Sequence, residues 1–143
     1  MFLDIKPSNI WLFPKNGLSR RVALFDFDTV LPTDENGYLL KPYPEQLPFS
    51  ESWSPYEQSH QQFSVVSRAT DVYAFGAIIY WLYTGNTVDS LALEKMRKKD
   101  FTFLDENKYF EGAQNAKGNV IDLLQQTLIR GTKHRAQNME DLL

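Results

Sequence analysis

The side chains best suited to chemistry lie near the start of the chain. Asp4, Lys6 and Asn9 fall within the segment D-I-K-P-S-N, and Asp26 follows in F-D-F-D. A carboxylate can accept the proton of a hydroxyl group, an ammonium group can balance negative charge, and amide or carboxylate oxygens are ligands that Mg²⁺ prefers. Each of these residues alone is more often a turn residue, a helix cap or a solvated charge. Their chemistry therefore depends on whether the fold brings them together.

Three further polar residues stand where predicted elements begin or end. Glu57 closes the segment S-P-Y-E, Asp71 lies in D-V-Y-A-F-G at the start of an apolar run, and Arg135 lies in K-H-R-A-Q-N. Considered singly, Glu57 is a solvated charge and Asp71 is an ordinary helix N-cap. Their order along the chain is the informative feature.

The first elements that could position these residues form a small hairpin. Residues 1–10, interrupted by Pro7, are expected to form a structured loop. Two short β-prone runs follow, at residues 10–13 and 22–25. Between them Pro14-Lys15-Asn16-Gly17 supplies turn chemistry, and Ser19-Arg20-Arg21 is expected to begin the return strand.

Residues 26–57 contain five of the seven prolines in the chain. Repeated proline blocks both helix propagation and strand pairing. This stretch is therefore expected to lack regular structure. A long irregular segment inside a compact domain is usually functional.

The remainder of the chain is expected to be helical. Residues 69–85 are apolar on nearly every face, which predicts a helix buried all round, with Thr70 or Asp71 as its N-cap and Gly85 at its C-terminal end. Asn119 and Asp122 predict the start of a later helix that runs to about residue 130. Further helices are expected at residues 91–99 and 139–143, and the apolar stripe of the 119–130 helix consists of Val120, Ile121, Leu124 and Leu128.

Composition restricts the class of protein. The 143 residues suit one domain, and 43% apolar with 23% charged residues exclude a disordered chain. A net charge of −3 argues against nucleic-acid binding. The absence of cysteine excludes thiolate chemistry and fits a reducing compartment. No apolar run resembles a signal peptide or a membrane span. These features predict a cytoplasmic protein without a membrane segment.

The order and spacing of these motifs resemble the C-terminal lobe of protein kinases, from the catalytic loop to the last helices of the domain. The segments S-P-Y-E-Q and H-R-A-Q-N-M-E-D-L-L are similar to those of the eukaryotic-type serine/threonine kinases of bacteria. The resemblance covers residues 1–143 and implies a mainly α fold, within the α+β family fold, with one small β-hairpin and no N-lobe. It divides the chain into a catalytic loop (1–9), a metal-ligand hairpin (10–28), an activation segment (26–57) and a helical subdomain (58–143).

The resemblance also implies a role for each candidate residue. Asp4 matches the catalytic base, and Lys6 matches the lysine that neutralises the transferred phosphoryl group. Asn9 and Asp26 match the ligands of Mg²⁺ in the cofactor site for ATP. The structural matches are Glu57, Asp71 and Arg135: an ion pair joins Glu57 to Arg135, and Asp71 caps the buried helix and holds the catalytic-loop backbone.

Three departures from the family pattern matter. The H-R-D triplet is replaced by Phe2-Leu3-Asp4, so no arginine stands beside the base to receive a phosphorylated activation segment. D-F-G is replaced by D-F-D, with Asp28 in place of glycine. The chain contains no G-x-G and no V-A-I-K lysine, so the ATP-covering lobe is absent from it.

Two functions follow from this pattern. The first is a serine/threonine protein kinase fragment that transfers phosphate from ATP to protein hydroxyls when an N-lobe completes it; the chain alone is expected to be inactive. The second is a pseudokinase-like binding module without catalysis, which Phe2, Leu3 and Asp28 favour. The expected partners are ATP, a protein substrate and the missing N-lobe. A lobe alone is also expected to expose the apolar surface that the N-lobe covers, and so to be poorly soluble or to dimerise.

Overall fold

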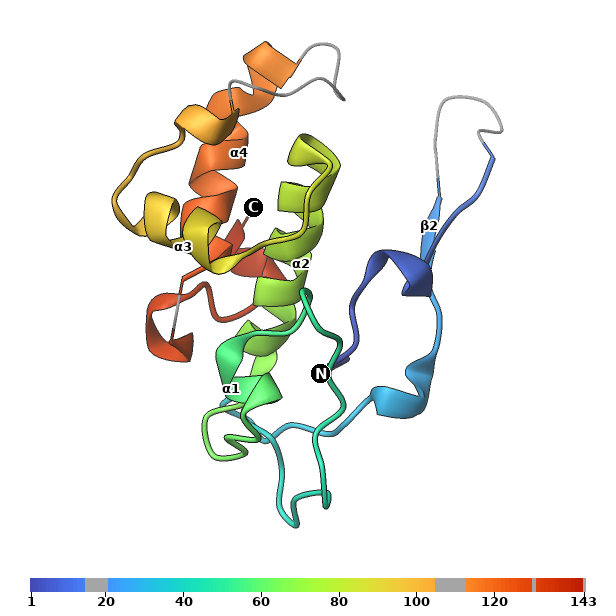
Figure 1. Ribbon diagram of the computed structural model, residues 1–143. Helices are drawn as coiled ribbons and strands as arrows, with labels where there is room; N and C mark the ends of the chain where they lie inside the picture. The colour runs from blue at the N-terminus through green and yellow to red at the C-terminus, as the bar shows by residue number, and fades with distance from the viewer. Residues whose placement is uncertain (15–20, 105–112, 130, 143) are drawn as a thin grey trace.

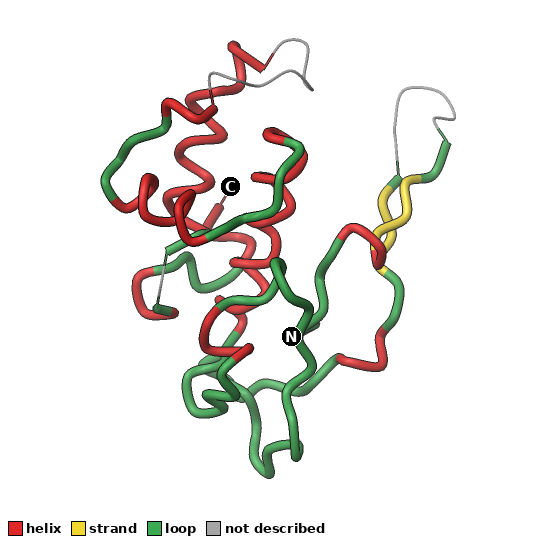
Figure 2. Tube along the Cα trace, viewed as in Figure 1, coloured by secondary structure: helices red, strands yellow, loops and turns green. Residues whose placement is uncertain are grey.

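The computed structural model describes residues 1–14, 21–104, 113–129 and 131–142, except for the side chains of 113–116. Within these ranges the chain is mainly helical and carries one two-stranded antiparallel sheet. The helices gather on one side of the molecule, and the sheet extends on the other (Figures 1 and 2). The predicted mainly α class with one small hairpin is confirmed at this level.

The hairpin consists of β1 (Ile10–Leu12) and β2 (Val22–Leu24), with Trp11 opposite Ala23. Both strands fall within the predicted runs. The predicted turn residues Lys15, Asn16 and Gly17, and the predicted return residues Ser19 and Arg20, lie outside the described residues. The strands are largely exposed, because no described helix covers them (Figure 1).

Residues 26–55 contain no described α-helix or multi-residue strand, as the prolines predict. The 3₁₀ turn η2 (Phe27–Thr29) is the only regular element in that stretch, apart from isolated bridges. Backbone hydrogen bonds between Met1 and Leu31 tie the segment to the chain start. A buried apolar cluster anchors its middle and consists of Leu3, Leu39, Leu47 and Val66.

The predicted buried helix is α2 (Arg68–Thr84). Its C-terminal end is as predicted: Gly85 has φ 74°, and its N–H donates to Trp81 O at 2.8 Å. The predicted N-cap is wrong, because Ser67 holds that position and the Thr70 hydroxyl accepts from the Ser67 N–H at 3.2 Å. Although α2 is apolar, neither it nor any other described helix is both long and apolar enough to cross a membrane.

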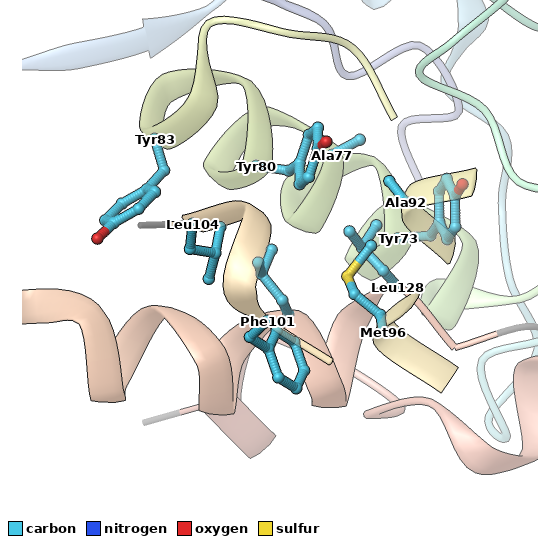
Figure 3. Close-up of a cluster of buried hydrophobic side chains, with 10 residues drawn as sticks. Tyr73, Ala77, Tyr80, Tyr83, Ala92, Met96, Phe101, Leu104 and Leu128 are labelled. Atoms are coloured by element: carbon cyan, nitrogen blue, oxygen red, sulfur yellow. The ribbon is translucent and has the colours of Figure 1, made fainter. Parts of the chain in front are cut away.

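The other helices pack around α2 (Figure 1). They are α1 (Tyr56–Ser59), α3 (Ser90–Arg97) and α4 (Ala113–Thr127), with short 3₁₀ turns at Thr102–Leu104, Thr132–His134 and Met139–Leu142. In Figure 3, aromatic side chains of α2 face Met96 of α3, the Phe101–Leu104 segment and Leu128 after α4. The predicted stripe is confirmed, since Leu124 and Leu128 are buried in this cluster and Val120 and Ile121 pack against it.

Three of the predicted helices differ from the structure in their bounds or type. Asn119 does not begin a helix: α4 starts six residues earlier, and Asn119 is exposed inside it. Four of the six residues before Asn119 are alanine, glutamine or lysine, whose high helix propensity favours propagation of the helix through Asn115 and Gly118. At the chain end the helix expected at 139–143 is a 3₁₀ turn over 139–142, and Leu143 lies outside the described residues. The helix predicted at 91–99 is α3, which ends two residues earlier than expected.

Gly76 permits the close packing of α2 on α4. A Cβ atom at this position would lie 2.1 Å from Thr127 Oγ1 and 2.5 Å from Thr127 Cβ. We expect Gly76→Ala to lower the free energy of unfolding by about 1–3 kcal/mol, because the helices must separate to admit the methyl group. Urea denaturation measures this change.

Gly118 in α4 provides the matched control for Gly76→Ala. A Cβ atom there would meet nothing within 4 Å. Gly118→Ala should therefore raise stability by up to about 1 kcal/mol, through helix propensity alone. Equal effects of the two substitutions would contradict the assigned packing.

Candidate functional site

The Asp4 carboxylate lies at the centre of a cluster of hydrogen-bond donors. Its Oδ2 lies 2.7 Å from Lys6 Nζ, and its Oδ1 accepts from Ser50 Oγ at 2.6 Å. Lys6 Nζ also donates to the same Ser50 oxygen at 3.0 Å. Asp4 itself is buried, with 8% of its surface exposed. One carboxylate, one ammonium group and one hydroxyl group therefore form a closed triangle.

Local chain geometry brings Asn9 into the same cluster. Pro7 restricts Lys6 to an extended backbone and begins the 3₁₀ turn η1 (Pro7–Asn9). This turn directs the Asn9 side chain back toward Asp4. Asn9 Nδ2 donates to the Asp4 backbone oxygen at 3.0 Å and to Asp4 Oδ2 at 3.2 Å. Because the amide nitrogen is engaged in this way, the orientation of the Asn9 amide oxygen is fixed.

These contacts determine the charge state of Asp4. Burial opposes its ionisation and is the largest single influence on its pKa. The hydrogen bonds from Lys6, Ser50 and Asn9, together with the positive charge of Lys6, outweigh burial and lower the pKa of Asp4 below its ordinary value. Asp4 is therefore a carboxylate at neutral pH and can accept a hydroxyl proton.

Sequence reasoning did not place Ser50 in this site. Ser50 lies 46 residues from Asp4, inside the proline-rich segment. Its position is set by a local turn in which Ser54 N–H donates to Ser50 O at 3.0 Å and Ser54 Oγ accepts from Ser50 N–H at 2.9 Å. The only signal in the sequence was a serine in a functional-looking loop, which does not identify its partner.

Asp71 in the first turn of α2 holds the backbone of the loop that carries Asp4. Its carboxylate accepts from Phe2 N–H at 2.7 Å and from Leu3 N–H at 2.8 Å. Leu3 has φ 68°, a left-handed conformation that is strained for a leucine and requires support from its surroundings. Burial raises the pKa of Asp71, and the two N–H donors oppose that rise. Asp71 therefore positions the loop rather than capping its own helix.

Asp26 does not join the Asp4 cluster. Its side chain is exposed, and it makes no hydrogen bond or ion pair to any described residue. Its backbone is left-handed, with φ 62°. The preceding N–H, of Phe25, donates to Asn9 O at 2.9 Å, which keeps this part of the chain beside Asn9. Within the described ranges no three His, Cys, Asp or Glu side chains are grouped to hold a metal.

The residues after Asp26 are also bound to the start of the chain. Thr29 Oγ1 donates to Phe2 O at 2.9 Å. The rings of Phe2 and Phe27 meet edge to face, with their centroids 5.3 Å apart. Phe2 therefore packs against the segment that carries Asp26 while its N–H is held by Asp71.

Glu57 and Arg135 form a buried ion pair. Arg135 Nη1 lies 2.7 Å from Glu57 Oε1, and the two side chains are 1% and 5% exposed. The guanidinium also donates to Ala69 O at 2.7 Å and to Ile129 O, and it lies over the Tyr73 ring. The charge of this buried cation is therefore paired, and most of its N–H groups have acceptors. The pairing that the resemblance implied is present, with Glu57 as the partner.

Comparison with known proteins adds no further assignment. No protein-family model matches the chain. A search among curated proteins also found no match.

Removal of Arg135 should be costly. We expect Arg135→Ala to lower the free energy of unfolding by about 3–5 kcal/mol, because Glu57 would be left buried without its cation. Chemical denaturation checks this value. The control is Lys98→Ala, whose ion pair with Glu94 is as short, 2.6 Å, but is exposed. That substitution should produce no measurable change, and a comparable loss in both variants would contradict the assigned role of burial.

Lowering the pH should remove the contribution of the Asp4 carboxylate to the free energy of unfolding. Because the pKa of Asp4 is lower in the folded state, its contribution to stability is present above its unfolded value of 3.8 and is lost as pH falls through the folded value. We expect the difference in stability between wild type and Asp4→Asn to shrink as pH is lowered from 6 to about 2.5. Urea titrations at several pH values measure it. Asp28→Asn, which alters an exposed carboxylate, serves as the control; a constant wild-type-to-Asp4→Asn difference would overturn the prediction.

Proposed function

We propose that this chain is the C-terminal lobe of a eukaryotic-type serine/threonine protein kinase, which transfers phosphate to protein hydroxyl groups when an N-lobe completes it. The observation that carries the proposal is the Asp4 carboxylate, which accepts a hydroxyl group at 2.6 Å while Lys6 Nζ lies 3.0 Å from the same oxygen. This is the arrangement that a base and a charge-neutralising cation need around an attacking hydroxyl.

In this proposal the substrate hydroxyl oxygen attacks the phosphoryl group, and Asp4 accepts the proton that this hydroxyl loses. The lowered pKa of Asp4 keeps it ionised for this role. Lys6 balances the negative charge of the phosphoryl oxygens. Ser50 holds the Asp4 carboxylate in place through its 2.6 Å hydrogen bond. Asp71 maintains the loop, through the N–H groups of Phe2 and Leu3.

Asn9 and Asp26 would hold Mg²⁺ with the ATP phosphates. The donor set fits this ion, because Mg²⁺ binds through one or two protein oxygens and completes its shell with phosphates and water. The Asn9 amide is oriented by Asp4, and the Asp26 carboxylate has no described protein partner that would compete for it. When bound, Mg²⁺ supplies charge neutralisation on the phosphate oxygens.

The exposed hairpin supports an N-lobe as partner. Most of the large exposed apolar side chains gather on the strands and the turn that follows. They are Trp11, Leu12, Phe13, Val22, Leu24, Phe25, Phe27 and Val30. Contiguous exposed apolar surface of this kind marks an interaction site. The predicted tendency to dimerise or to be poorly soluble rests on the same surface.

A pseudokinase-like binding module is the second candidate. The observation that favours it is Leu3, which is buried in an apolar cluster at the position where the family carries an arginine. Asp28 in place of glycine points the same way. Such a module would use the exposed hairpin to bind its partner without transferring phosphate. For either function, the absence of cysteine from the whole sequence supports a cytoplasmic location.

A fusion distinguishes the two functions. The chain is joined to the N-lobe of a bacterial serine/threonine kinase that carries a glycine-rich loop and its lysine, and transfer of labelled phosphate from ATP to a generic protein substrate is measured. We expect transfer that Asp4→Asn reduces by about 10²–10⁴-fold, because the base is lost. The matched control is Glu35→Gln, an exposed carboxylate without a described partner, which should leave transfer unchanged.

Three results of the fusion experiment bear on the proposal. Transfer that depends on Asp4 supports a kinase lobe. A folded fusion that shows no transfer but in which the two lobes resist separation by proteolysis supports the binding module. Transfer that is equal in wild type and Asp4→Asn overturns the assignment of Asp4 as the base.

A further inference from the structure

A separate pocket lies among the helices and shares none of the proposed catalytic residues. Its volume is about 830 Å³, and α1, α2, α3, α4 and the segment around Arg135 line it. Pockets that bind small molecules commonly measure about 300–1,000 Å³. The volume of this pocket therefore falls in the range of pockets that bind one small molecule.

The wall of the pocket is mainly apolar. Leu93 and Met96 come from α3, Leu124 comes from α4, and Leu128 and Ile129 follow α4. Leu93 is half-buried, whereas Met96, Leu124 and Leu128 are buried in the main core. An apolar body placed here would be removed from water and would contact side chains that the core already holds in position.

One polar residue of the wall is a tyrosine. Tyr73 lines the pocket and is 8% exposed as a residue, but its hydroxyl is not among the enclosed atoms without a hydrogen bond in the described part of the chain. Its ring lies beneath the Arg135 guanidinium, at 5.0 Å. A tyrosine hydroxyl can both donate and accept, so Tyr73 offers a hydrogen bond to a polar atom of a ligand.

The unbalanced charge of the lining is positive. Glu57 is paired with Arg135, and Glu94 is paired with Lys98. Arg97 and Lys99 are exposed lining residues that make no ion pair with the part of the chain that the structure describes. Arg97, Lys99 and Arg135 outnumber Glu57 and Glu94 in the lining, so the lining carries a net positive charge. This charge favours an anionic group on the ligand.

We propose that this pocket binds an amphipathic anion, an apolar chain or ring system that carries one carboxylate. The apolar body contacts Leu93, Met96 and Leu124, and the carboxylate faces Arg97 and Lys99. The proposal is independent of phosphoryl transfer, because it uses neither Asp4 nor Lys6. It assigns the chain a small-molecule site remote from those residues.

Calorimetric titration with laurate, below its micelle concentration, tests the site. Dodecyltrimethylammonium has the same chain length but the opposite charge, and dodecanol is the neutral comparison. We expect saturable binding of one laurate per chain, weaker binding of dodecanol, and no saturable binding of the cation. Laurate and the cation binding equally would overturn the proposal, since the apolar wall alone would then be responsible.

Two variants locate the bound laurate. Arg97→Ala/Lys99→Ala should weaken laurate binding by about threefold or more and leave dodecanol binding unchanged, because exposed ion pairs contribute modestly. Arg21→Ala/Lys133→Ala removes the same charge from exposed positions outside the pocket and should have no effect. Leu93→Trp, with folding verified by circular dichroism, should abolish binding by filling the pocket. Unchanged laurate affinity in Arg97→Ala/Lys99→Ala would overturn the proposal even if Leu93→Trp failed to fold.

Discussion

The two hydrogen bonds that the Asp71 carboxylate accepts from Phe2 and Leu3 are the constraint on which the candidate site depends. They join the first turn of the central helix to a loop whose backbone is strained at Leu3. Strain of this kind costs about 1–3 kcal/mol and persists only where the surroundings impose it. Asp71 is half-buried, and desolvation raises its pKa. The two hydrogen bonds serve both partners: the half-buried carboxylate obtains two N–H donors, and the strained loop is anchored to the helix. Because Phe2 and Leu3 directly precede Asp4, these two hydrogen bonds hold the backbone that carries the Asp4 carboxylate.

The same turn of α2 also contacts the Glu57–Arg135 ion pair. Three consecutive residues make separate contacts: the Ala69 carbonyl accepts from Arg135, the Thr70 hydroxyl lies 3.5 Å from Glu57 Oε1, and Asp71 binds the loop at the chain start. This one turn of α2 therefore contacts three separate parts of the chain: the end of the proline-rich segment, the segment after α4 and the chain start. A helix whose core packing is already determined by α4 is a suitable reference, because close-packed interiors resist small displacements.

Those features of the sequence that depend on local pattern were predictable. The apolar run of α2, its C-terminal glycine, the hairpin strands and the stripe of α4 follow from periodicity and turn chemistry. Asp71 was harder to interpret, because a carboxylate in the first turn serves equally well as a cap and as a long-range acceptor. Asn119 was misinterpreted because a capping residue is also tolerated on an exposed helix surface when packing on the core holds the helix in place; Val120 and Ile121, directly after it, pack against the core. Ser50 could not be found, since its contact with Asp4 spans 46 residues and is set by the path of a segment without periodicity. The resemblance supplied the remaining site residues, and the structure places Asp4, Lys6 and Asn9 in one cluster and Asp26 outside it.

Asp26 is the proposed metal ligand that the structure leaves outside the Asp4 cluster. Its backbone is left-handed, and yet its carboxylate caps nothing and pairs with nothing among the described residues. Ordinary turn aspartates relieve such strain with a hydrogen bond to a nearby N–H group. Here the hydrogen bond from Phe25 N–H to Asn9 O and the turn that follows hold the Asp26 backbone in this conformation. The chain therefore places a carboxylate without a described partner next to Asn9, whose amide nitrogen is bound to Asp4. The Asn9 amide oxygen accepts only a long hydrogen bond from Ser8 Oγ, at 3.4 Å. In the proposed kinase lobe this oxygen and the Asp26 carboxylate are the hard oxygens that a cation with its phosphate ligands requires, whereas the proposed binding module has no use for them.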